Sequence, residues 1–238
     1  MSSRLSVQLR EGTAAVHRKA ERMTLIQALL RGLTDRETYA RLTSAYLHIY
    51  TALEEELRRH AHHPVVAPLV LPELWRRQAL QADLRALTGS REPPRPSLAV
   101  QAYCQRLRWI GQHDPARLVA HAYTRYLGDL AGGRILGRIV GRALDLQPGS
   151  GLDFYQFPTI DDLPAYRDTY RKRLDALPIA PAQVPAIVAE AREAFACNMA
   201  VFAEFEGSAL KGLLHFVKGR RRRKHPGTVG VPSTGALA

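Results

Sequence analysis

Apolar side chains recur every three or four residues along most of this 238-residue chain. That spacing is typical of α-helices that bury one face and expose the other. The clearest example is a helix predicted from Thr34 to about His60, in which Thr34 and Glu37 have the spacing of a capping box. Its buried face is expected to carry Tyr39, Leu42, Tyr46, Ile49, Tyr50 and Leu53.

The same pattern predicts further helices, separated by connectors that are rich in proline and glycine. The segment 60–72 carries Pro64, Pro68 and Pro72, and proline disfavours a central strand, so we interpret it as a loop. Helices are expected at about 3–20 (capped by Ser2 or Ser3), 25–31 (closed by Gly32), 72–87, around 100–110, 114–144, 164–176 and 183–206, the last continuing to about Val217. The prediction is a single all-α domain over 1–217, followed by a basic tail over 218–238 that is expected to be disordered.

One predicted helix, 120–144, contains far more glycine than a helix normally tolerates. Its glycines are Gly128, Gly132, Gly133, Gly137 and Gly141. Each costs about 0.5–1 kcal/mol relative to alanine, so together they cost roughly 3–5 kcal/mol. Such a cost indicates that something approaches the backbone closely, or that the helix bends there.

The spacing divides these glycines between two faces of the helix. Gly128 and Gly132 open one face beside Asp129, and the other three open a neighbouring face, where another helix is expected to pack. A carboxylate on a bared helix is consistent with a flat ligand lying on the backbone, and equally with a kinked core helix and a solvated aspartate. The order Gly-x-x-x-Gly-Gly does not match a dinucleotide fingerprint, and no phosphate loop follows.

Net charge and cysteine content narrow the class of protein. The formal net charge is +12, of which residues 220–224 supply five, so the body of the chain is itself basic. A basic body is compatible with nucleic acid, an acidic protein partner or an anionic ligand. No apolar run approaches the roughly 18 residues of a spanning helix, and the two cysteines form no zinc or disulfide pattern. We therefore expect a cytoplasmic protein without a membrane span.

Further candidate chemistry lies on the N-terminal helix and near residue 170. Arg10 and His17 are seven residues apart, hence on one face and roughly 10 Å apart, and Glu21 follows one turn later. A lone histidine is more often structural than a ligand. This spacing could nevertheless set a metal ligand and a cation at the centre and acidic edge of one porphyrin. Arg167 and Arg171 also share a face, although such pairs are usually solvated.

The run AHAYTRYLGDLAGGRIL, which contains the glycine pairs, resembles the distal helix of heme oxygenases. LREGTAAVHRKAE resembles the segment that carries the proximal histidine of that family, and LHIYTALEEEL, AYRDTYRKRL and AREAFACNMAVFAEFE resemble other parts of it. The resemblance covers roughly 5–206. It implies a multi-helix fold that holds heme between the first, proximal helix and a kinked, glycine-rich distal helix.

The resemblance also implies roles for individual residues. His17 would be the axial iron ligand, with Glu21 beside it. The heme-binding set would further include Arg10 (usually lysine in the family), Tyr123, Arg167, Tyr170 and Arg171 at the propionates, Gly128, Gly132 and Gly133 under the ring, and Phe195 against it. A distal water network that delivers protons would contain Asp129, Tyr50, Arg125 and Asn198. From the residues alone, Tyr50 could equally be a core aromatic and Asn198 a satisfied mid-helix amide.

The implied activity is a heme oxygenase reaction, in which heme b is both substrate and cofactor. Oxygen and external electrons would open the ring at a meso carbon, α by default, to give biliverdin, carbon monoxide and Fe²⁺. The electron donor would be an acidic ferredoxin or an NAD(P)H-dependent flavoprotein reductase, and the protein a monomer. One alternative is a heme shuttle or sensor without turnover. The other is a basic nucleic-acid binder, which the even spread of charge disfavours.

Overall fold

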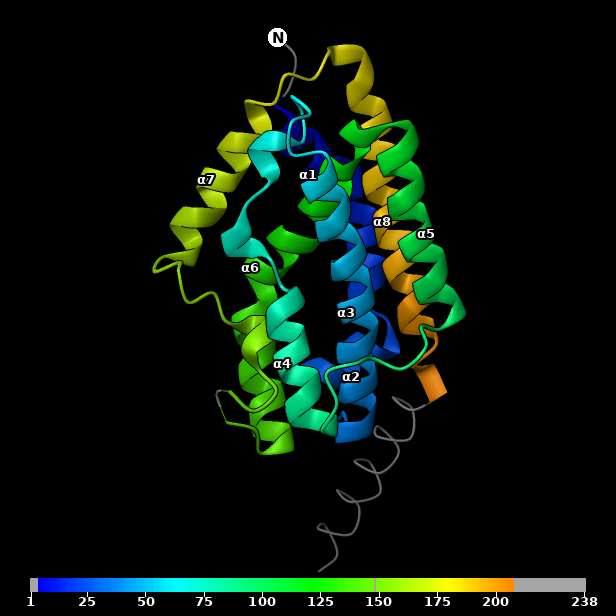
Figure 1. The fold of residues 1–238 in the computed structure, drawn as a ribbon, viewed down its shortest axis with the longest axis vertical. Coiled ribbons are helices and arrows are strands. Elements are labelled where there is room, and N and C mark those ends of the chain that lie inside the picture. The colour runs from blue at the N-terminus through cyan, green and yellow to red at the C-terminus, as the bar shows by residue number, and fades with distance from the viewer. Residues whose placement is uncertain (1–3, 148, 208–238) are drawn as a thin grey trace, which may run out of the picture.

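The structure is a computed structural model that describes residues 4–147 and 149–207. In this part of the chain every regular element is helical (Figure 1), which confirms the predicted all-α class. The α-helices are α1 (Leu5–Glu21), α2 (Thr24–Leu30), α3 (Arg36–Arg59), α4 (Arg77–Thr88), α5 (Leu98–His113), α6 (Leu118–Leu144), α7 (Leu163–Asp175) and α8 (Val184–Ala203). Short 3₁₀ turns are η1 (Ala67–Leu69), η2 (Pro72–Leu74), η3 (Pro115–Arg117), η4 (Asp153–Tyr155) and η5 (Pro181–Gln183).

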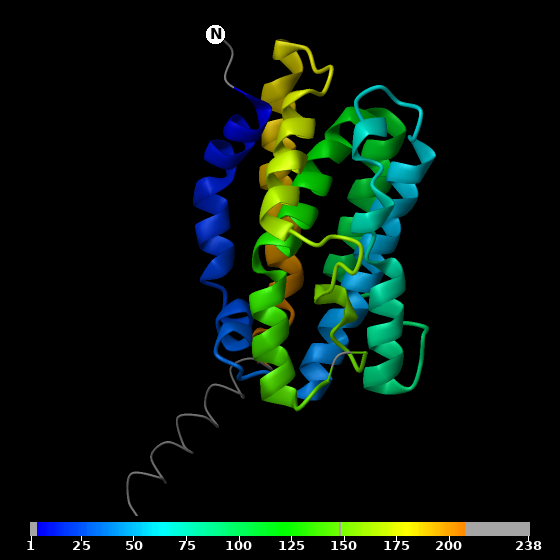
Figure 2. The same cartoon turned by 90° about the vertical axis from the view of Figure 1, so that its left-hand side faces the viewer.

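Long helices pack side by side around a shared apolar core (Figures 1 and 2). The N-terminal helix α1 packs mainly along α8 and also contacts α7, whereas α3 packs against α4 and α5. Helix α6 crosses the molecule against α8 and is helical from Leu118 to Leu144, so the kink stays a prediction. Helix α1 packs against α7 and α8, and a space is left between α1 and the middle of α6.

Several predicted helix starts are wrong. Helix α3 is capped by Asp35, whose Oδ1 accepts the N–H of Thr38 at 2.7 Å, and not by a capping box on Thr34. Helix α1 begins after Arg4, which makes no side-chain cap; Ser2 and Ser3 lie outside the described residues, as do Val217 and the tail.

Helix α4 begins at Arg77, five residues later than predicted. The buried carboxylate of Glu54 on α3 accepts the backbone N–H groups of Arg76 and Arg77, at 2.5 and 3.2 Å, and so serves as a cap supplied by another helix. Burial, opposed by these two hydrogen bonds, raises the pKa of Glu54 to about 7. A local sequence pattern cannot reveal a cap that comes from a residue more than twenty positions away.

The second glycine face of α6 packs against a turn and its loop, not against another helix as predicted. A Cβ atom on Gly137 would lie 2.9 Å from the Cβ of Tyr155 in η4, and one on Gly141 would lie 3.0 Å from a methyl group of Leu152. These two glycines are therefore needed because neighbouring side chains approach the backbone too closely for a methyl group.

A buried charge cluster ties α5, α6 and α8 together. Glu190 accepts hydrogen bonds from Arg106 and from the Nε2 of His121, each at 3.0 Å to Oε1. Burial by itself would raise the pKa of Glu190, but these hydrogen bonds outweigh it and lower the pKa to about 2. A carboxyl group whose pKa falls on folding stabilises the native state above its unfolded pKa, near 4.5.

This cluster predicts a specific pH dependence of stability. At neutral pH, Glu190→Gln should lower the free energy of unfolding by about 2–3 kcal/mol, because the partly buried Arg106 guanidinium and the buried His121 ring lose their carboxylate partner. The difference from wild type should shrink as the pH falls from about 4.5 toward 2, because protonation of Glu190 removes the same interaction. Urea unfolding of both proteins between pH 3 and 7 measures this difference in the free energy of unfolding. A constant difference over that range would contradict the role of Glu190.

Candidate functional site

A pocket of about 540 Å³ separates α1 from α6, within the size range of small-ligand and cofactor sites. Helices α7 and α8 complete its walls. Its lining comes from the start and face of α1 (Arg4, Ser6, Val7, Arg10, Thr13, His17), from α6 (Tyr123, Thr124, Leu127, Gly128, Ala131), from α7 (Asp168, Arg171, Lys172, Asp175) and from α8 (Phe195). The two helices that the sequence singled out therefore face each other across a cavity.

His17 reaches this pocket from α1 with one ring nitrogen uncommitted. Its side chain is 53% exposed, and its Nδ1 lies 3.5 Å from the Oε1 of Glu21. Its ring meets the Phe195 ring edge-on, with centroids 5.5 Å apart. The Nε2 has no hydrogen-bond partner within the described chain, so a metal could bind there while Glu21 orients the ring.

One edge of the pocket is cationic. Arg10 and Arg171 line it and lie close enough to Tyr123 to counteract the rise in its pKa that burial causes. Arg171 is partly held by Asp168, with the Nη1–Oδ1 pair at 2.6 Å. Guanidinium groups bind carboxylates in a paired fork geometry, so this edge suits an acidic ligand.

Two predicted members of this edge do not line the pocket. The pocket face of α7 carries residues 168, 171, 172 and 175, whereas Arg167 and Tyr170 lie to the side of it. Tyr170 is fully buried, and its hydroxyl, like the Nε of Arg167, has no hydrogen-bond partner among the residues that the structure describes. Arg167 and Arg171 are one turn apart on α7, but Arg167 lies at the edge of the face that borders the cavity, so only Arg171 lines it.

Lys172 and Arg4 are lining residues that the sequence interpretation missed. Lys172 follows Arg171 directly, so a signal was present, but a run of cations on a helix is normally solvated. Asp175 also lines the pocket, and it anchors α1 by accepting the N–H and the hydroxyl of Ser6 at 2.8 and 3.0 Å. This contact spans 169 residues and had no sequence signal.

On the pocket wall formed by α6, opposite α1, the glycines of this helix lie on two different faces, as their spacing predicts. Cβ atoms built on Gly128 and Gly132 would meet no atom within 4 Å, whereas one on Gly133 would lie 3.6 Å from a ring carbon of Tyr155. Gly133 therefore faces the η4 side, and the structure does not bring it to the pocket. The open strip of backbone consists of Gly128, which lines the pocket, and Gly132 one turn further along α6, which is not among the lining residues.

The four predicted distal residues form one cluster beside this strip, in which Tyr50, Arg125 and Asn198 are buried and Asp129 is partly exposed. The Tyr50 hydroxyl donates a hydrogen bond to the Asp129 carboxylate, and Arg125 donates to the side-chain oxygen of Asn198 at 2.6 Å. The Arg125 guanidinium lies 4.5 Å from the Tyr50 ring centre and 4.4 Å from that of Tyr46. Tyr46 therefore also belongs to this cluster, although the sequence pattern places it only on the buried face of its helix.

Burial raises the pKa of Asp129 above that of an ordinary aspartate, although Arg125 and the Tyr50 hydrogen bond act in the opposite direction. The Nε of Arg125 and the hydroxyl of Tyr126 are buried and have no hydrogen-bond partner within 4–147 and 149–207. Buried polar atoms normally have partners, and ordered water supplies those that protein does not. The cluster therefore fits a network that contains water, with a carboxyl group able to exchange protons.

An imidazole on one wall, a bare helix backbone with a carboxyl group on the other, and a cationic edge between them fit heme and its two carboxylates. In the part of the chain that the structure describes, these features define an all-helical protein with a site that fits heme.

Residues 3–204 match the family model described as heme oxygenase. Heme oxygenase 1 of Synechocystis sp. is 42% identical over 239 residues, covering 98% of this chain and 99% of the relative. The crystal structure of heme oxygenase-1 from that cyanobacterium, in complex with heme, has a TM-score of 0.86 and 41% identity, covering 92% of this chain and all of the other. Heme oxygenase from Leptospira interrogans has a TM-score of 0.82 and 40% identity, covering 85% of this chain and all of the other. The chain belongs to the heme oxygenase family, and its activity is the oxidative degradation of heme.

Within residues 4–147 and 149–207, no helix is both long and apolar enough to cross a membrane.

The two glycine faces predict opposite effects of substitution. Gly132→Leu should leave the heme-free fold intact, since its Cβ meets open space, but should reduce heme turnover about tenfold or more by filling the strip. Gly137→Ala, the matched control on the same helix, should lower the melting temperature because its Cβ would collide with Tyr155. Thermal melts and single-turnover heme degradation measure both. Full activity in Gly132→Leu would make that glycine a packing residue only.

Proposed function

We propose that heme b binds between α1 and α6 with the Nε2 of His17 as axial ligand. Glu21 orients the imidazole from 3.5 Å, and Phe195 supports it from α8. Arg10, Tyr123 and Arg171, joined by Lys172, bind the propionates along the cationic edge. Gly128 and Gly132 let the ring and oxygen approach the backbone of α6.

Heme supplies both the iron that activates O₂ and the ring carbon that is oxidised, ultimately to biliverdin, carbon monoxide and Fe²⁺. Asp129 holds water at the distal side and passes protons to that water. Burial raises the pKa of Asp129, which brings this pKa closer to the working pH. Tyr50 fixes the carboxylate by its hydrogen bond, while Arg125 and Asn198 hold each other beside it. The cluster contains no histidine that could act as the acid–base catalyst of O–O cleavage.

The meso carbon attacked is set by how the ring rotates about its axis in the pocket. The propionate contacts of Arg10 and Arg171 determine that rotation, because arginine forks fix the carboxylates in position as well as in charge. We propose attack at the α-meso carbon.

Electrons come from an external protein. The rim of the pocket presents Arg4, Arg10, Arg171 and Lys172, a set that attracts an acidic donor. We propose a ferredoxin or a flavoprotein reductase in this role, acting on a monomer with a heme domain over 1–217 and a basic tail over 218–238.

The observation that carries the proposal is the Tyr50–Asp129 pair next to the open glycine strip, across the pocket from His17. Its test is reconstitution with heme under O₂, with a ferredoxin system and a flavoprotein reductase in parallel reactions. Chromatography of the pigment should give the α isomer of biliverdin, with one carbon monoxide per heme. Stable heme binding without pigment under both donors would favour the shuttle or sensor alternative.

A further inference from the structure

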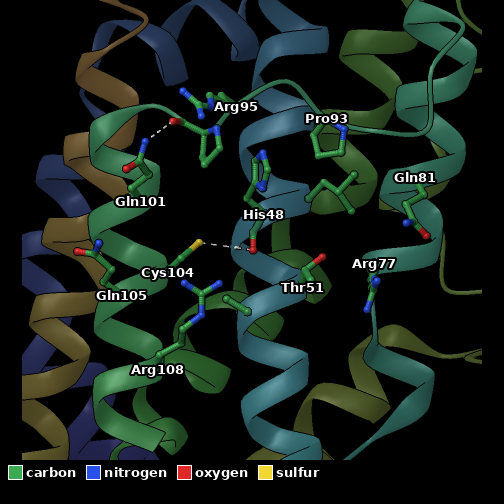
Figure 3. A pocket seen from close by; sticks show the side chains of 13 residues that line it. His48, Thr51, Arg77, Gln81, Pro93, Arg95, Gln101, Cys104, Gln105 and Arg108 are labelled. Carbon is green, nitrogen blue, oxygen red and sulfur yellow. Dashed lines mark hydrogen bonds between the residues drawn. The ribbon is translucent and has the colours of Figure 1, made fainter.

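A second cavity, of about 720 Å³, shares no lining residue with the heme pocket. Figure 3 shows its construction: α3 forms the floor with His48 and Thr51, α4 and α5 form the walls, and the connector between α4 and α5 crosses above. The heme pocket, in contrast, is built from α1, α6, α7 and α8. Any ligand here would therefore be bound independently of heme.

The roof of this cavity is fixed in place. The Nε2 of His48 donates to the carbonyl oxygen of Pro94 at 2.9 Å, and the side-chain amide of Gln101 donates to that of Pro96 at 2.7 Å. The prolines of the connector restrict its backbone further. Because floor and wall both hold the roof, the cavity is preformed and does not depend on a ligand to open it.

The lining is cationic. It contains Arg77, Arg95 and Arg108 and no carboxylate. The Oε1 of Glu55, which is not a lining residue, lies 3.5 Å from the Nη1 of Arg77 and partly neutralises the charge of Arg77. Arg95 and Arg108 form no ion pair within the described residues, and Figure 3 shows Arg108 and Arg77 on opposite walls, flanking Thr51. Arg95 and Arg108 line the cavity without carboxylate partners and so leave positive charge for a ligand to neutralise.

The remaining lining restricts the chemistry of that ligand. The Cys104 thiol donates to the carbonyl oxygen of His48 at 3.5 Å, and burial raises its pKa to about 11, so it remains a thiol. The Nε2 of His48 is already committed to Pro94. Leu47, Ala52 and Pro93 add apolar surface beside the charges.

We propose that this cavity is a second binding site, for a small organic anion that carries phosphate or carboxylate groups on a partly apolar body. Arg95 and Arg108 bind the oxyanion, Thr51 and the amide side chains of Gln81 and Gln105 supply neutral hydrogen bonds, and the apolar patch takes the body. Guanidinium forks match both kinds of oxyanion.

The test is calorimetric titration with ADP and, separately, with citrate, in about 0.15 M salt, which screens non-specific attraction to a basic chain. At least one probe should bind with one-to-one stoichiometry. The double variant Arg95→Gln/Arg108→Gln should weaken that binding about tenfold or more, since each charged hydrogen bond is lost. ADP binding would identify the source as a phosphate, and binding of citrate alone would identify a carboxylate.

The matched control is Arg138→Gln/Arg142→Gln, which removes the same charge from exposed positions on α6. Binding of the probe should be unchanged in it. Neither probe binding, or equal weakening in both double variants, would overturn the proposal. Heme titration should give wild-type spectra for every variant, so a failure here is distinguishable from a failure of the heme site.

Discussion

Asp129→Ala should lower the rate of biliverdin formation by about 10²–10⁴-fold while heme still binds. That range is the usual contribution of a positioned proton donor. Asp129 lies outside the lining of the heme pocket yet beside its open glycine strip, so its removal leaves His17 and the cationic edge untouched. Single-turnover absorbance at defined O₂ and reductant measures the rate, and chromatography identifies the pigment.

The alanine variant also leaves the buried Tyr50 hydroxyl without its acceptor, which costs stability by about 1–3 kcal/mol. Asp129→Asn provides the control, because its amide oxygen can still accept that hydrogen bond but the side chain cannot relay a proton. It should be nearly as inactive as Asp129→Ala and more stable. Wild-type biliverdin yield in Asp129→Asn would show that the carboxyl group is not the proton relay.

His17→Ala should abolish the normal heme spectrum and reduce turnover at least about 100-fold. Loss of a group that merely supports a metal ligand already costs about 10–100-fold, so loss of the ligand itself should cost more. The histidine side chain is half exposed and its ring meets the Phe195 ring only edge-on, so the fold should survive its removal. Absorption and resonance Raman spectra of the reconstituted variant report the axial ligand.

Added imidazole distinguishes ligand loss from misfolding. It should enter the space that His17→Ala leaves, restore the spectrum and recover part of the activity. Glu21→Gln should show a smaller loss, because it weakens the orientation of the ring without removing the ligand. An unchanged spectrum in His17→Ala would require another iron ligand and would overturn the assignment.

Some of the site follows from local sequence, because helix geometry relates residues three and four apart. The spacing of Gly128 and Gly132 against Gly137 and Gly141 predicted two faces, and the structure has one open and one packed. The relation of His17 to Glu21 follows from the same geometry. The family resemblance added the distal cluster, since nothing local connects Tyr50 to Asp129 across 79 residues.

Other parts of the site depend on the angle at which one helix packs on another. Arg167 and Arg171 share a stripe in the sequence, yet only Arg171 lines the pocket, beside Lys172. The start of α4 was misplaced for a related reason, since its cap comes from Glu54 on α3. The second cavity had no sequence signal, because its arginines come from three separate segments.

The sequence by itself determined the helical class and the two glycine faces, because these depend on periodicity within one helix, and its resemblance to a family supplied the candidate iron ligand. Only the tertiary structure decided that a pocket separates α1 from α6 and which cations line that pocket. It also decided which side chains pack on the second glycine face and which arginines have no carboxylate partner. Those features depend on contacts between segments distant in the chain, and the free energy that fixes them comes from packing the whole core rather than from any one helix.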